Sequence, residues 1–215
     1  MEGALCGSEP GLRLIETLLW DGSQMPRLPR HLARLERSAT RLAWSCDPDA
    51  ARAALLAAAP RDLARMRLTL DAGGQLEVTA TALTAPQPLW RLGLANRRLS
   101  SGDPWLRVKS TRRPVHDPVR AAIPAGLDEM IFINERDEVC EGTITNIFFD
   151  LGDGLCTPPL LSGLLPGILR EELLESGQCR EALFPHRDLG RARLWVGNSL
   201  RGLVPAVFGL AMPMS

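Results

Sequence analysis

The sequence predicts an α+β protein built from two lobes. Three observations predict this: many short apolar segments end at turn residues and favour strands, fewer segments show the helical period, and a proline-punctuated stretch separates two groups of elements. At 215 residues the chain is long enough for one large domain or two small ones. We expect a small N-terminal lobe at 1–84, a linker at 85–89 and a C-terminal lobe at 90–215.

The N-terminal lobe is expected to contain strands at 12–20, 66–71 and 76–82 and helices beginning at Pro29 and near Asp49. Pro29 suits the first turn of a helix, and one helical face then collects the apolar residues Leu32, Leu35, Ala39 and Leu42. The second helix ends before Pro60. Gly73-Gly74 separates two strand-like segments and predicts a hairpin.

The boundary between the lobes is expected at Ala85-Pro86-Gln87-Pro88, because two prolines interrupt an extended stretch. The C-terminal lobe should hold two helices, one near 115–123 and one opened by Pro166-Gly167. Its expected strands are 90–96, 105–111, 130–134, 139–142, 146–151 and 193–200. The strand at 105–111 would carry Lys109.

The bulk composition excludes several classes of protein. Twenty-five basic and 25 acidic residues cancel, so nothing points to nucleic acid. No apolar run is long enough to cross a bilayer, and the N-terminal residues do not resemble a secretory signal. The five cysteines are scattered without a C-x-x-C pair, which favours free thiols over a metal site and a reducing compartment. We expect a cytoplasmic protein without a metal.

Lys109 is the one lysine among the 25 basic residues. Arginine replaces lysine wherever a positive charge is sufficient, so the exception marks a position that arginine cannot fill. Arginine stays protonated, whereas a lysine amine can lose its proton and act as a nucleophile. A single lysine surviving by chance on a solvated surface is the competing interpretation.

Three other local features allow both a functional and a structural interpretation. Glu141, flanked by Cys140 and Gly142, is either a buried acid with a function or a salt-bridge partner of an arginine. Pro166-Gly167 opens a helix whose free N–H groups suit a phosphate, although many helices start this way without a ligand. The small polar residues after Gly197 can bind an anion or form a plain turn.

Five ordered motifs together resemble the class IV aminotransferases, the fold-type IV enzymes that use pyridoxal 5′-phosphate. The motifs are His31-x-x-Arg34-Leu35-x-x-Ser38, Val108-Lys109-Ser110-Thr111, Glu141-Gly142-Thr143-x-x-Asn146, Gly163-x-Leu165-Pro166-Gly167-Ile168 and Asn198-Ser199-Leu200-Arg201-Gly202. The resemblance runs from about Leu12 to Pro205. It implies a small N-terminal α/β sandwich lobe, a larger C-terminal β-barrel-like lobe, and a homodimer acting on a small carboxylated amine.

The resemblance also implies a role for each motif. Lys109 would form the Schiff base with pyridoxal 5′-phosphate and then move the Cα proton of the substrate. Glu141 would pair with the nitrogen of the pyridine ring. Arg34 would bind the phosphate, together with the backbone N–H groups of Ile168 and Leu169 and with Ser199.

The reaction stays open at this stage, because the lyase and transaminase branches share these residues. The Asn198-Ser199-Leu200 motif looks more like 4-amino-4-deoxychorismate lyase, which would serve folate synthesis, than like the branched-chain aminotransferases. Those aminotransferases also tend to place a tyrosine soon after the lysine, and this chain has no tyrosine. Arg113 is a candidate for that contact with the cofactor, with an ordinary surface arginine as the alternative. A branched-chain or other small amino-acid aminotransferase is the second hypothesis, and a non-catalytic relative is the third.

One departure from the family pattern is local. The hairpin before Glu141 contains Glu135-Arg136-Asp137-Glu138, where a glycine would be expected.

Overall fold

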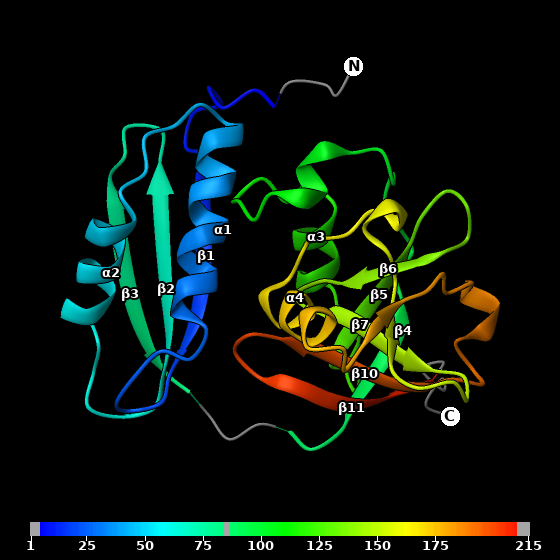
Figure 1. Ribbon diagram of the computed structural model, residues 1–215. Helices are drawn as coiled ribbons and strands as arrows, with labels where there is room; N and C mark the ends of the chain where they lie inside the picture. The colour runs from blue at the N-terminus through cyan, green and yellow to red at the C-terminus, as the bar shows by residue number, and fades with distance from the viewer. Residues whose placement is uncertain (1–4, 84–86, 210–215) are drawn as a thin grey trace. The chain divides into compact units, whose positions relative to one another are not determined.

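A computed structural model describes residues 5–83 and 87–209 and separates them into two compact units (Figure 1). The first unit holds residues 5–83 and the short segment Val108–Arg112, and the second holds residues 87–107 and 113–209. The predicted α+β class, with a small lobe and a barrel-like lobe, is confirmed. Within the described ranges, no helix is both long and apolar enough to cross a membrane.

The division differs from the predicted one in one respect. We expected the lobe at 90–215 to carry Lys109, yet Val108–Arg112 groups with the first unit. The reason is that this segment makes backbone hydrogen bonds to the first strand of that unit. The predicted linker at 85–89 begins outside the described residues, which include neither Ala85 nor Pro86.

The first unit is a three-stranded antiparallel sheet in the order β1-β2-β3, formed by β1 (Arg13–Trp20), β2 (Ala64–Asp71) and β3 (Leu76–Ala82). Helices α1 (Leu28–Arg41) and α2 (Pro48–Ala57) contact each other and the sheet, so they share one face. Even-numbered residues on β1 and β2 are buried there, for example Leu18 opposite Met66. The helix predicted from Pro29 is confirmed, with proline in its first turn.

The second unit is a closed barrel of six strands. The strands are β4 (Trp90–Leu94), β5 (Glu129–Ile133), β6 (Val139–Gly142), β7 (Asn146–Asp150), β10 (Arg193–Asn198) and β11 (Gly202–Phe208). They follow the order β10-β11-β4-β5-β6-β7, and β7 also pairs with β10, which closes the ring. One cluster of buried apolar side chains draws on all six strands and is therefore the barrel interior; it includes Leu92, Ile131, Val139, Phe149, Val196 and Val204. The short strands β8 (Cys156–Thr157) and β9 (Arg180–Glu181) extend the sheet beyond β7.

Two helices pack on the outside of the barrel. Helix α3 (His116–Ala121) contributes Val119 to a cluster with Phe132 of β5. Helix α4 (Ile168–Glu175) contributes Leu169 and Leu173 to a cluster with Phe148 of β7. Phe148 and Ile147 are both fully buried, because β7 has the barrel interior on one side and α4 on the other.

The strand predicted at 105–111 is wrong. Pro104–Arg107 forms a 3₁₀-helix, and only an isolated bridge between Leu14 and Ser110 follows it. The cause is local, because Pro104 fixes a helical φ and the Asp103 carboxylate accepts a hydrogen bond from the Trp105 N–H (2.9 Å). Lys109 therefore lies in an extended segment with a single bridge.

Strand β11 did not appear among the predicted elements. Pro205 lies in its middle, and proline usually argues against a central strand. The strand tolerates it because pairing with β4 begins only at Ala206, after the residue that has no N–H. Pro205 faces Trp195 in the pairing with β10.

In the hairpin before Glu141, Asp137 takes the position where the family pattern would place a glycine. Asp137 has φ 61°, in the left-handed region where glycine is favoured. It closes a turn in which the Asp137 N–H donates to Asn134 O (3.3 Å) and the Asn134 N–H donates to Glu138 O (2.9 Å). Aspartate tolerates this conformation better than most residues, and its carboxylate accepts a hydrogen bond from Arg98 (2.6 Å).

Replacing Asp137 with glycine should make the protein more thermostable than replacing it with alanine. Both variants lose the exposed Arg98 contact, but only glycine removes the Cβ from a left-handed residue. A strain difference of this kind shifts Tm by about 3 °C in a chain of this size. Calorimetry of the two variants checks this, and an equal or higher Tm for Asp137→Ala contradicts it.

Candidate active site

Two backbone hydrogen bonds fix Lys109 beside β1. The Ile15 N–H donates to the Lys109 carbonyl (2.9 Å), and the Thr111 N–H donates to Arg13 O (2.8 Å). Thr111 Oγ1 also accepts a hydrogen bond from the Arg13 N–H (2.9 Å). The Lys109 side chain is half-buried, between the buried residues Val108 and Ser110. The lysine thus has a backbone held by hydrogen bonds and a half-buried side chain.

A buried charged cluster lies in the same unit, where α1 covers β1. Arg34 donates twice to the Glu16 carboxylate, from Nε to Oε1 (2.9 Å) and from Nη2 to Oε2 (2.6 Å). His31, one turn earlier on α1, places Nδ1 2.6 Å from the same Oε2. All three residues are at most 5% exposed. The cluster holds the guanidinium of Arg34 in one orientation.

The charge states of this cluster follow from its contacts. Burial would raise the pKa of Glu16, but the Arg34 guanidinium and the His31 hydrogen bond oppose it and lower that pKa to about 2. Burial lowers the pKa of His31; the hydrogen bond and charge of Glu16 oppose this, the positive charges of Arg34 and Lys109 add to it, and the pKa stays below its usual value. Glu16 is therefore an anion that neutralises Arg34. Since the charge of Lys109 acts on His31, Lys109 and the cluster are near one another.

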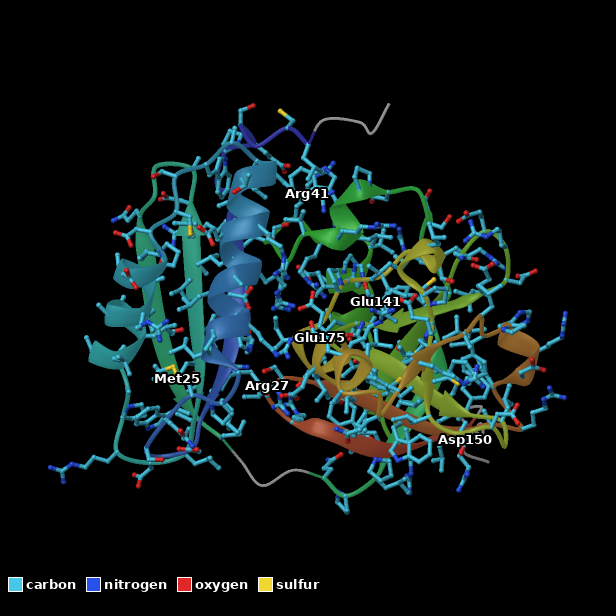
Figure 2. The ribbon with its side chains drawn as sticks, in the orientation of Figure 1. Met25, Arg27, Arg41, Glu141, Asp150 and Glu175 are labelled. Atoms are coloured by element: carbon cyan, nitrogen blue, oxygen red, sulfur yellow. The ribbon has the colours of Figure 1, made fainter. Side chains whose placement is uncertain are left out.

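Glu141 lies on β6 in the second unit and is 6% exposed (Figure 2). Its Oε1 lies 2.9 Å from Nε2 of His116, and its Oε2 accepts a hydrogen bond from the Leu165 N–H (3.0 Å). Asn146, the strand partner of Glu141, donates from Nδ2 to the Leu165 carbonyl (3.0 Å). Leu165 is thus tied through both backbone groups to the β6–β7 pair.

That tie places the start of α4 close to Glu141. Gly167 is the residue before the helix, and a Cβ added there would lie 1.9 Å from Asn146 Oδ1. Glycine is therefore required for close packing at this point. Ile168 and Leu169 are buried, and their N–H groups are among those that helix geometry leaves without an intrahelical acceptor. These N–H groups suit an anion.

The turn after β10 is organised by Asn198. Its Oδ1 accepts hydrogen bonds from the N–H groups of Leu200 (3.1 Å) and Arg201 (3.0 Å), and its Nδ2 donates to Ile144 O (3.2 Å). Ser199 is buried inside this turn. Asn198 therefore has a structural role in holding Ser199.

Arg113 makes contacts other than the one predicted for it. Its Nε donates to Asp117 Oδ1 (2.8 Å), and its Nη2 donates to the carbonyl of Thr143. These bonds join the start of α3 to the loop that follows β6. A contact of Arg113 with a cofactor stays a prediction.

The structure divides the predicted residues between its two units. Lys109 and Arg34 belong to the first unit, and the residues Glu141, Ile168, Leu169, Ser199 and Arg113 belong to the second. Two buried partners were missed. Glu16 had no assigned role although it precedes the first motif, and His116 lies outside every motif. Only their burial could have drawn attention to Glu16 and His116, and burial cannot be read from the sequence.

Comparison with known proteins identifies the family. The model of the family described as Amino-transferase class IV matches residues 13–207. The chain belongs to the class IV aminotransferases, a family of aminotransferase and lyase enzymes, and it is an enzyme.

Three similar proteins narrow the context. The crystal structure of a proposed amino-acid aminotransferase from Mesorhizobium loti is 44% identical, with a TM-score of 0.88, over 92% of this chain and 100% of that one. The 4-amino-4-deoxychorismate lyase from Pseudomonas aeruginosa is 27% identical, with a TM-score of 0.76, over 91% of this chain and 82% of that one. A proposed aminodeoxychorismate lyase of Schizosaccharomyces pombe is 29% identical over 175 residues, covering 78% of this chain and 75% of that protein.

Replacing Glu16 with glutamine should lower the free energy of unfolding by about 3 kcal/mol at pH 7, because it removes the carboxylate that balances the buried Arg34 charge. The contribution of Glu16 is fully present above its usual pKa of 4.5 and is lost as the pH falls from there to about 2. The gap between wild type and variant should therefore narrow over that range. Urea unfolding at pH 7, 4.5 and 3 measures it.

Glu77→Gln is the matched control, because Glu77 also pairs with an arginine of β1, Arg13, but has a side chain that is 62% exposed. Its effect should be much smaller. An equal effect of the two variants, or a Glu16 gap that does not change with pH, contradicts the assignment.

Proposed function

We propose that this enzyme uses pyridoxal 5′-phosphate on Lys109 to eliminate pyruvate from 4-amino-4-deoxychorismate, leaving 4-aminobenzoate. The observation that carries the proposal is the place of Lys109. The one lysine of the chain is half-buried, has its backbone hydrogen-bonded to β1, and lies near the buried cluster of Glu16, His31 and Arg34.

The residues present fit the cofactor. A primary amine at Lys109 can bind its aldehyde, and a buried carboxylate at Glu141 can hold its ring nitrogen. The guanidinium of Arg34, the N–H groups at the start of α4 and the hydroxyl of Ser199 suit its phosphate. The close approach at Gly167 supports this, since a Cβ there would push Asn146 or the helix start aside.

When bound, the cofactor supplies an electron sink for the carbanion formed at the substrate Cα. The chain supplies the rest. The Lys109 amine removes the proton at that carbon, the neighbouring C–O bond to the enolpyruvyl group breaks, and a proton goes to the departing enolpyruvate, which becomes pyruvate while the ring becomes aromatic. The Glu141 carboxylate is held in one orientation by two donors, His116 and the Leu165 N–H. Arg34 is already oriented by Glu16, so binding a phosphate requires little further ordering.

Two observations support the lyase. The Pseudomonas aeruginosa enzyme and the Schizosaccharomyces pombe relative carry that name. The chain also lacks tyrosine, which the branched-chain aminotransferases tend to place after the lysine. Transamination of a small amino acid is the second candidate, favoured by the likeness to the Mesorhizobium loti protein.

Product analysis tests the proposal. Purified enzyme with added pyridoxal 5′-phosphate and 4-amino-4-deoxychorismate should release pyruvate and 4-aminobenzoate without any keto-acid acceptor. Lys109→Arg should lower the rate by about 10³-fold or more, because it keeps the charge but removes the nucleophile and base. Turnover of amino acids that depends strictly on a keto acid, with no pyruvate from 4-amino-4-deoxychorismate, would contradict the lyase and support the transaminase.

A further inference from the structure

We infer that His116 is a positioning residue that holds the Glu141 carboxylate in one orientation, ready to bind the ring nitrogen of the cofactor. The inference rests on the role proposed for Glu141. Nε2 of His116 lies 2.9 Å from Oε1 of Glu141, and the two residues are 7% and 6% exposed.

The proton on this contact can be assigned. An ionised carboxylate only accepts hydrogen bonds, so Nε2 of His116 must be the donor. The Leu165 N–H donates to the other oxygen, Oε2 (3.0 Å). Each oxygen of Glu141 then has one protein donor, and a carboxylate oxygen can accept about two. Glu141 therefore keeps acceptor capacity for one more N–H.

The His116 imidazole packs against the ring of Phe132. His116 is the first residue of α3, and its ring lies 4.9 Å from that of Phe132, centroid to centroid, at 59°. Phe132 is fully buried on β5. Arg113 fixes the approach to this helix through Asp117 and the Thr143 carbonyl. The ring therefore has a defined orientation toward Glu141.

Glu141 depends on this contact for its orientation. Within the described residues its side chain accepts hydrogen bonds only from His116 and the Leu165 N–H. Removing the His116 donor leaves one oxygen of the buried carboxylate without a hydrogen bond and no longer fixed in place. Loss of His116 should therefore weaken the contact between Glu141 and the ring nitrogen.

The alternative is that His116 only fills space against Phe132. Two substitutions separate these roles. His116→Phe keeps an aromatic ring but removes the donor, whereas His116→Gln can present an amide N–H toward Glu141. The readouts are the dissociation constant of pyridoxal 5′-phosphate for purified apoenzyme, measured by absorbance titration, and the Tm of each apoenzyme.

His116→Phe should weaken cofactor binding by about 10- to 100-fold, the effect of losing a hydrogen bond to a charged group, and His116→Gln should recover most of it. Glu141→Gln should weaken binding as well. Adding His116→Phe to Glu141→Gln should change binding by no more than about twofold, because His116 then has no charge to hold.

Particular results would contradict the positioning role of His116. Wild-type affinity in His116→Phe, or a full additional loss in the double variant, overturns the inference even if the proposed function stands. A Tm loss with unchanged affinity assigns His116 a packing role and also overturns it. Failure of the proposed cofactor is distinct, because wild type itself would then bind no pyridoxal 5′-phosphate, and a transaminase in place of the lyase would leave the role of His116 unchanged.

Discussion

The pairing of Val108–Arg112 with β1 is the interaction on which the placement of Lys109 in the first unit depends. The chain passes from the N-terminal sheet of the first unit into the second unit. The five residues Val108–Arg112 then belong to the first unit again, and from Arg113 the chain continues in the second unit. Within those five residues, the bonds from Ile15 to Lys109 and from Thr111 to Arg13 fix the backbone on both sides of Ser110. Glu16 follows Ile15 directly, so the same strand positions Lys109 through its backbone and Arg34 through a side chain. Weakening β1 would disturb both functional groups together.

In the second unit the buried carboxylate of Glu129 fixes the backbone next to Glu141, as the pairing with β1 fixes the backbone of Lys109 in the first unit. Glu129 is fully buried, and its two oxygens accept hydrogen bonds from the N–H groups of Thr143 (2.9 Å) and Ile144 (3.1 Å) and from the Thr145 hydroxyl (3.0 Å). Arg120 lies 3.7 Å from it and balances its charge. This fixes the loop that joins β6 to β7, the strands of Glu141 and Asn146. The barrel thus presents Glu141 on a closed and rigid scaffold.

The sequence predicted regular elements well, because they depend on local pattern. The strand at Val139–Gly142 is an example, and the role of Lys109 stays a prediction. It failed where one residue overrides the pattern, as Pro104 does before Lys109 and Pro205 does within β11. It also missed contacts made at a distance. Glu141 meets His116 from 25 residues away and Glu16 meets Arg34 from 18, and no periodicity reports such pairs.

The central claim is that Lys109 carries the cofactor. Borohydride reduction of the enzyme with pyridoxal 5′-phosphate, followed by peptide mapping with mass spectrometry, tests it directly. We expect one pyridoxyl group, on the peptide that contains Lys109. An unmodified Lys109 after incubation with excess cofactor would contradict it, whatever the activity of the preparation.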